Sequence, residues 1–150
     1  MSVTPEQIKE LREETGVSLM KCKEALEESN GDMDQARALL REQGAKAAAK
    51  KADRELNAGI VASYIHPNNS VGVLLKLACE TDYVAKNDDF VALANDINLH
   101  IAAMMPESVE ELLEQPFVKN PDVTISKLIE ENTLKIGERI DVAEFTRYEI

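Results

Sequence analysis

Apolar residues recur every three or four positions through residues 1–44, which is the spacing of one buried face of a helix. Thr4-Pro5-Glu6-Gln7 forms a capping box with proline at the first helical position, and Asp32-Met33-Asp34-Gln35 forms a second box. We expect the third helix to end at Gly44. Short amphipathic helices bury their stripes only against one another, so residues 1–44 are predicted to form a three-helix bundle.

Residues 45–57 are rich in alanine, the strongest helix former, and present no apolar stripe larger than alanine. They are therefore predicted to form a solvated linker helix. Lys46, Lys50 and Arg54 repeat at every fourth position and make one basic ridge. This ridge is either a solvated face or a contact for an acidic surface on a partner or for RNA.

After Gly59 the hydrophobic period changes to two, which is typical of a half-buried strand. Alternation is clearest in residues 71–79, and a preceding run, residues 60–66, is joined to it by Pro67-Asn68-Asn69-Ser70. The two runs predict an antiparallel hairpin. Residues 139–150 predict a last strand, in which imperfect alternation indicates a bulge.

Two helices are predicted within residues 58–150, at about 88–105 and at 125–136. We therefore expect a three-stranded antiparallel sheet covered by helices, and an α+β fold class for the chain. The first helix has apolar residues on a second side as well, which indicates a subunit or partner interface. The stripe predicted to cover the sheet comprises Phe90, Leu93, Ala94, Ile97, Ile101 and Met104, and the second side comprises Ala92, Leu99, Ala102 and Ala103.

Composition and charge narrow the classes of function. Seventeen basic and 28 acidic residues give a net charge of −11, which favours a protein partner over nucleic acid or a membrane surface. The sequence has no glycine-rich phosphate loop, nucleophile elbow or metal-spaced cluster of cysteine and histidine, so we expect neither an enzyme nor a bound metal or cofactor. Cys22 and Cys79 occupy apolar positions, which indicates buried thiols in a reducing compartment, the cytoplasm.

Each of the two histidines has an ordinary structural interpretation. His66 precedes Pro67 at a strand end and is predicted to be a turn or surface residue. His100 lies at the rim of the predicted core helix, four residues after Asp96. It is predicted to be a core-edge residue hydrogen-bonded to Asp96, or otherwise a partner contact.

The segment Thr81–Phe90, between the hairpin and the long helix, resists a purely structural explanation. Thr81 is suited to cap a short helix, which places Asp82 and Tyr83 in its first, exposed turn. An aromatic ring beside a carboxylate there is either ordinary capping with a packed ring or a projecting wedge.

That segment, TDYVAKNDDF, resembles the TDFVAKN-type signature of elongation factor Ts, the family of exchange factors for the translational GTPase elongation factor Tu. Similarity to the family extends over nearly the whole chain and follows the family's order. Residues 8–40 resemble its helical N-terminal domain, 44–55 its linker, 59–88 its core hairpin and signature, 99–107 the end of its core helix, and 115–119 with 135–150 its C-terminal part.

The resemblance implies three regions: a domain at 1–44 similar to ubiquitin-associated domains, a linker at 45–57, and a core at 58–150. The sequence departs from the family in two main ways. Tyr83 stands where members usually have phenylalanine, and the helical insertion that members usually carry is shortened to around 106–115. The basic pair common in the last strand is replaced by Ala143-Glu144.

The resemblance also implies a function. Such a chain binds the GTPase domain of elongation factor Tu and promotes GDP release by placing Asp82 and Tyr83 near the magnesium and phosphate side of the nucleotide site. Short members act as homodimers, and no direct binding of nucleic acid is implied. The partner-binding residues carried over are Thr81, Asp82, Tyr83, Val84, Val17, Leu19, Met20, His100 and Met104.

A second class of function remains open from the first 44 residues alone. Three-helix bundles of this size also occur in ubiquitin-associated domains, so an adaptor or another protein-binding module is the alternative. That alternative leaves TDYVAKNDDF unexplained.

Overall fold

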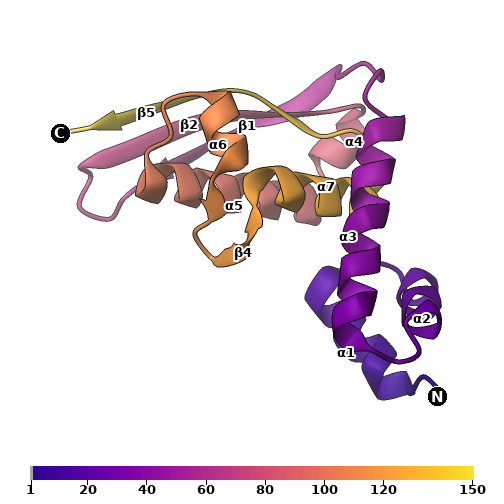
Figure 1. Cartoon of the computed structure of the whole chain (residues 1–150). Helices are drawn as coiled ribbons and strands as arrows, with labels where there is room; N and C mark the ends of the chain where they lie inside the picture. The colour runs from indigo at the N-terminus through magenta and orange to yellow at the C-terminus, as the bar shows by residue number, and fades with distance from the viewer. Residues whose placement is uncertain (1) are drawn as a thin grey trace.

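The computed structural model describes residues 2–150, and it begins with a head of three helices at one end of the molecule (Figure 1). These are α1 (Pro5–Thr15), α2 (Leu19–Glu28) and α3 (Met33–Lys50). The predicted capping box at Thr4 is confirmed, because Thr4 and Gln7 exchange side-chain to backbone hydrogen bonds. The three helices bury their apolar stripes against one another, as predicted. The buried residues of the head are Leu11, Val17, Cys22, Ala25, Leu26, Ala36 and Leu40.

The expectation that the third helix ends at Gly44 is wrong, because α3 continues without interruption to Lys50. A glycine inside a helix costs only about 1 kcal/mol relative to alanine, and the alanine-rich residues that follow favour the helix. Gly44 instead lies where α3 passes α7 (Ile125–Ile136), and a Cβ atom there would lie 3.1 Å from the carbonyl oxygen of Glu130. Residues 45–50 of the predicted linker helix are the last part of α3, but its continuation to residue 57 is wrong, because residues 51–54 turn the chain toward β1. A division into separate folding units stays a prediction.

The predicted three-stranded antiparallel sheet is confirmed. Its strands are β1 (Ala58–Ile65), β2 (Val71–Cys79) and β5 (Asp141–Glu149), in the order β1-β2-β5. The register between β2 and β5 shifts between Lys76 and Leu77, so that one additional residue of β5, Ala143, lies between their partners. This irregularity is the predicted bulge.

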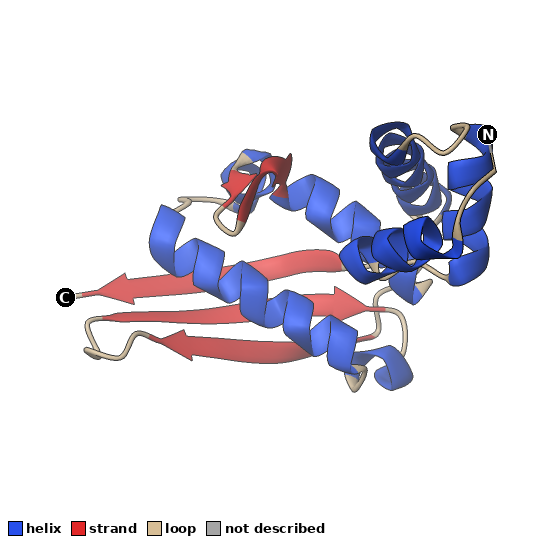
Figure 2. Cartoon of the chain, turned by 90° about the horizontal axis from the view of Figure 1, so that it is seen from below, coloured by secondary structure: helices blue, strands red, loops and turns tan. Residues whose placement is uncertain are grey.

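Helices cover one face of this sheet, and the fold class is α+β as predicted. The central helix, α5 (Asp88–Met104), runs along that face with α7 beside it, while the opposite face has no helix over it in the part of the chain that the structure describes (Figure 2). The segment between α5 and α7 contains α6 (Val109–Glu114) and a short hairpin of β3 (Pro116–Phe117) and β4 (Asn120–Thr124). The hydrophobic pattern did not predict these elements.

Most of the predicted stripe of α5 is buried against the sheet. Met104 is the exception: 42% of it is exposed, so its assignment to the buried stripe is wrong. It is the last residue of α5, and Met105 after it turns the chain away with a positive φ of 52°. The buried members of the stripe are Phe90, Leu93, Ala94, Ile97 and Ile101.

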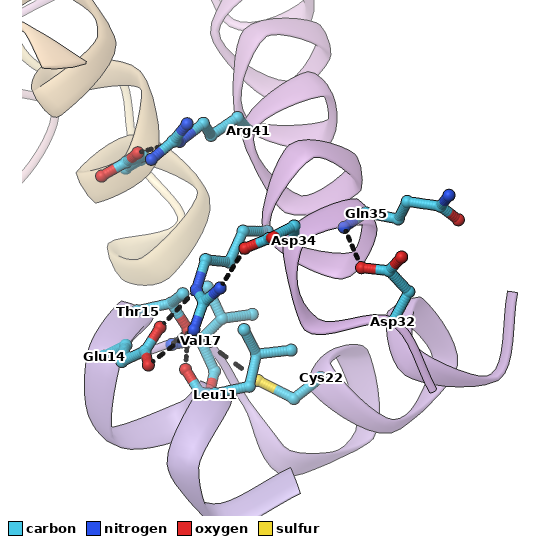
Figure 3. Close-up of polar contacts among 11 residues, drawn as sticks. Leu11, Glu14, Thr15, Val17, Cys22, Asp32, Asp34, Gln35 and Arg41 are labelled. Atoms are coloured by element: carbon cyan, nitrogen blue, oxygen red, sulfur yellow. Dashed lines mark hydrogen bonds and ion pairs between the residues drawn. The ribbon is translucent and has the colours of Figure 1, made fainter. Parts of the chain in front are cut away.

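The head is joined to the core chiefly through α3 and α7. Arg41 of α3 reaches toward α7 (Figure 3) and forms an ion pair with Glu131 at 3.4 Å. Leu134 of α7 packs against the apolar core of the head. Within the head, Arg37 donates two hydrogen bonds to Glu14, and this pairing lowers the pKa of the Glu14 carboxyl. The two halves therefore share apolar, ionic and close backbone contacts.

Replacing Gly44 by leucine is expected to lower the free energy of unfolding by about 1–3 kcal/mol, because the new side chain would meet the backbone of α7. Urea denaturation monitored by circular dichroism measures the change. Ala49→Leu, on an exposed position of the same helix, is the matched control and is expected to be nearly neutral. Equal stability of the two variants would contradict a close helix contact at Gly44.

Candidate functional site

The turn that carries Tyr83 is held at the surface by its buried neighbours. It is the short helix α4 (Asp82–Ala85), in which Val84 and Ala85 are only 5% and 7% exposed, whereas Tyr83 is 83% exposed. Because successive residues of a helix point in different directions, burying two of them forces the tyrosine outward. The ring is not packed against its own chain, so the projecting arrangement is confirmed over the packed one.

Two helix caps bracket this turn. Thr81 caps α4 as predicted, since its hydroxyl accepts a hydrogen bond from the backbone N–H of Val84 at 3.3 Å. Asn87 caps α5, and its side-chain oxygen accepts from the backbone N–H groups of Asp89 and Phe90 at 2.8 and 3.4 Å. The chain is thus held on both sides of Tyr83.

A third contact at this turn was missed from the sequence. The carboxylate of Glu138 accepts hydrogen bonds from the backbone N–H and from the hydroxyl of Thr81. The two residues lie 57 positions apart, and the hydrophobic pattern holds no signal that joins them. Only the antiparallel pairing of β2 with β5 brings them together.

A second candidate surface lies on the head, where α1 and α2 form an apolar groove. Leu19 and Met20 are 49% and 71% exposed in it. Three cations border it, although the chain as a whole is acidic. Val17, predicted as a neighbouring contact, is 3% exposed and packs inside the head instead. The residues lining the groove are Pro5, Ile8, Lys9, Arg12, Leu19, Met20 and Lys23.

His100 is buried, and its predicted hydrogen bond to Asp96 is wrong. Asp96 pairs with Lys119 at 2.9 Å. The Nδ1 atom of His100 accepts from the backbone N–H of Val118 at 3.0 Å, so Nε2 carries the proton and donates to Gln115 Oε1 at 2.9 Å. Gln115 follows α6 and Val118 lies in the β3–β4 hairpin, so both partners come from the segment after α5, which helical spacing alone did not indicate. Burial lowers the pKa of this imidazole.

The structure does not bring all the predicted contact residues together. Tyr83 precedes α5, whereas Met104 is its last residue. Since α5 has 17 residues, its two ends lie roughly 25 Å apart at the usual rise per residue. The groove with Leu19 and Met20 is lined by α1 and α2, which lie beside the end of α3 that is far from the sheet (Figure 1). The candidates therefore form three separate places: the Tyr83 turn, the head groove, and the end of α5.

Other predicted features have ordinary structural roles. The predicted basic ridge is not continuous, because Arg54 lies beyond the end of α3 at Lys50. Lys46 pairs with Glu42 at 3.3 Å and Arg54 with Glu80 at 3.4 Å. Both cysteines are buried and free, as predicted, and burial raises the pKa of each thiol. His66 is exposed at the hairpin end, as predicted.

Two features are absent from the part of the chain that the structure describes. None of the helices in residues 2–150 is long and apolar enough to span a membrane. The same residues contain no group of three or more histidine, cysteine, aspartate or glutamate side chains placed to hold a metal ion.

Comparison with known proteins decides the family. A profile of the family described as Elongation factor TS matches residues 7–111 and 80–150. The chain belongs to the elongation factor Ts family. Proteins named Elongation factor Ts from Carboxydothermus hydrogenoformans and Heliobacterium modesticaldum are 40% and 42% identical to it over 99% of this chain and 89% and 90% of their own. One from Fervidobacterium nodosum is 40% identical over all of this chain and 99% of its own.

Membership of the elongation factor Ts family makes this chain a translation elongation factor. The alignment with the Carboxydothermus protein runs over 193 positions, although this chain has 150 residues, so that relative carries some tens of residues that this chain lacks. Their place at residues 106–115 stays a prediction. There the structure has α6 and short connections between α5 and β3.

We expect a titration midpoint below 6.5 for His100, the ordinary value, in an NMR experiment on its ring protons. Because the folded chain binds fewer protons at this site than the unfolded chain, the stability that His100 contributes is present above about pH 6.5 and is lost as the pH falls. The free energy of unfolding is therefore expected to decline more between about pH 7 and pH 5 in the wild type than in His100→Gln. A midpoint at or above 6.5 would contradict this.

Proposed function

We propose that this chain is a guanine nucleotide exchange factor for elongation factor Tu, which binds the GTPase domain and promotes release of GDP. One observation carries the proposal: Tyr83 is 83% exposed on a turn in which the next two residues are buried and which lies between the N-caps of α4 and α5. A large apolar ring held outward by a rigid turn loses little conformational entropy on binding, and such rings are frequent anchors of interfaces.

Exchange of this kind makes and breaks no covalent bond. A protein that binds the nucleotide-free GTPase more tightly than the GDP form must weaken GDP binding by the same factor, because the two equilibria are linked. Each tenfold difference corresponds to about 1.4 kcal/mol. The chain therefore has to offer contacts that only the nucleotide-free GTPase satisfies fully.

Asp82 and Tyr83 are the residues proposed to make those contacts. By analogy with the family, they enter near the magnesium and phosphate side of the nucleotide site, with the ring between side chains of the GTPase. Displacing the groups that hold the hydrated magnesium ion removes the neutralisation of the diphosphate. The exposed carboxylate of Asp82 adds repulsion toward the phosphates, and buried Val84 supports the turn from within.

The head groove is proposed to supply affinity. Its apolar floor, with Leu19 and Met20, suits an apolar helix or loop of the GTPase domain, and its border of Lys9, Arg12 and Lys23 suits acidic residues beside that segment. Val17 supports the groove from inside the head.

A homodimer is proposed through the uncovered face of the sheet. Val61, Ile65, Leu74 and Tyr148 are between 54% and 75% exposed there. The register places Ile65 and Tyr148 on either side of Gly72, so the apolar residues extend across all three strands. A second copy supplies a matching sheet, and two such sheets pack face to face about 10 Å apart.

This face is a better dimer surface than the second side of α5 considered from the sequence. There Leu99 and Ala102 are half-buried by the chain itself, and the carbonyl oxygen of Ala102 accepts hydrogen bonds from Arg147 at 3.2 and 3.0 Å. Ala103 and Met104 remain exposed at the end of the helix and stay candidate contacts.

Replacing Tyr83 by alanine is expected to leave the fold intact, because the ring is exposed, and to slow catalysed GDP release about thirtyfold, the effect of losing an anchor worth about 2 kcal/mol. Stopped-flow release of fluorescent GDP from elongation factor Tu measures the rate. Tyr83→Phe, which retains the ring, is the matched control and is expected to stay within about threefold of the wild type.

Titrating the exchange factor in the same assay separates affinity from exchange. Met20→Ala in the head groove is expected to raise the half-saturating concentration more than it lowers the maximal rate. Unchanged kinetics in Tyr83→Ala would overturn the proposed mechanism. Binding to ubiquitin without any effect on GDP release would support the adaptor alternative instead.

Light scattering at micromolar concentration is expected to give about twice the chain mass of 16.6 kDa. Leu74→Glu, at the centre of the uncovered sheet face, is expected to shift the mass toward 16.6 kDa, because two buried copies of the new charge would repel each other. Val118→Glu, on an exposed position outside that face, serves as the control. A wild-type mass of one chain would exclude the dimer.

A further inference from the structure

One carboxylate holds the beginning of the Tyr83 turn from a distant part of the chain. Glu138 directly follows Gly137, the residue with positive φ that ends α7. Its Oε1 accepts hydrogen bonds from the backbone N–H groups of Glu80 and Thr81 at 3.1 and 3.0 Å. Its Oε2 accepts a hydrogen bond from the hydroxyl of Thr81 at 2.7 Å. Three donors at the beginning of α4 thus converge on one side chain.

The bond to the hydroxyl determines how Thr81 caps the helix. A hydroxyl has one proton, and here it is donated to Glu138, which leaves the oxygen lone pairs to accept from the backbone N–H of Val84 at 3.3 Å. Bonds to an ionised carboxylate are short and stronger than neutral ones. Glu138 therefore fixes the side-chain rotamer of the cap, and through it the direction in which the first turn of α4 points.

A reciprocal set of bonds closes the same region. Glu80, which donates to Glu138, accepts through its own Oε2 from the backbone N–H of Arg139 at 2.7 Å. The guanidinium of Arg139 donates to the carbonyl oxygen of Arg54 at 2.7 Å, and Arg54 pairs with Glu80 at 3.4 Å. These contacts continue the connection between β2 and β5 beyond their last ladder pair. The beginning of α4 is thereby attached to the segment after α7.

We propose that Glu138 is a positioning residue for nucleotide exchange, which directs Tyr83 toward the GTPase without touching the partner itself. The inference rests on the proposed function, because it concerns the same turn. Val84 and Ala85 anchor the end of α4 in the core, while Glu138 sets its beginning. Tyr83 lies between these two attachments, so its direction depends on both.

The test compares Glu138→Gln with the wild type in a titration of fluorescent GDP release from elongation factor Tu. Glutamine keeps the shape but loses the charge and one of the two acceptor oxygens. We expect the maximal rate to fall about tenfold, since a misplaced group sharply reduces a geometry-dependent rate. The half-saturating concentration is expected to change less than about threefold, because the head groove is untouched. Glu110→Gln, on an exposed position of α6, carries the same charge change as a control.

Two further measurements separate positioning from general stability. Hydrogen exchange of the Val84 amide is expected to accelerate in Glu138→Gln, because its acceptor hydroxyl loses its fixed orientation. A double variant with Thr81→Val is expected to be no slower than the slower single variant, because both changes act on the same cap. Losses that multiply in the double variant, or an unchanged Val84 exchange rate, would contradict the inference.

The outcomes distinguish this inference from the proposed function. If Tyr83→Ala does not slow GDP release, the proposed mechanism fails whatever Glu138 does. If Tyr83→Ala slows release while Glu138→Gln keeps the wild-type maximal rate, only the positioning role is overturned. Glu138→Asp keeps the charge but shortens the reach, and it replaces Glu138→Gln in the same test, with the same expected loss, if the glutamine variant does not fold.

Discussion

The position of the candidate site depends on the burial of Val84 and Ala85 directly after Tyr83. These two small apolar side chains fix a helix of only four residues against the core, a length that has almost no stability of its own in water. Because the anchor is apolar and the caps on either side are polar, the turn is held by two independent kinds of interaction. The exposed tyrosine follows from that anchoring and needs no contact of its own.

The head is likewise attached to the core by both apolar and charged contacts. A three-helix unit of roughly forty residues is near the lower limit for independent folding, and here it gains a further apolar neighbour from Leu134 of α7. Arg41 and Glu131 add an ion pair to this contact. Burial raises the pKa of the Glu131 carboxyl, and the nearby Arg41 opposes that rise. The head groove and the Tyr83 turn therefore belong to one connected scaffold.

What the sequence predicted well is local. The capping residues Thr4 and Thr81 act within their own turns, and the alternation of residues 71–79 reports the burial of one strand face directly. What it could not predict is set by segments far apart in the chain. The partners of His100 come from the end of α6 and from the β3–β4 hairpin, and Glu138 reaches Thr81 only because two strands pair. A helix end and a close contact between helices both favour glycine, for different reasons, so the sequence alone does not distinguish them at Gly44.

The continuous α3 affects which positions of the chain can be substituted in evolution without moving the head relative to the core. Where Gly44 passes Glu130, backbone lies almost directly against backbone, so the spacing between the two helices does not depend on the identity of any large side chain. Solvent-facing residues of the head and of the core can then be substituted independently of one another. The separation between the head groove and the Tyr83 turn would stay the same when such surface residues are substituted, because the contact between α3 and α7 sets it.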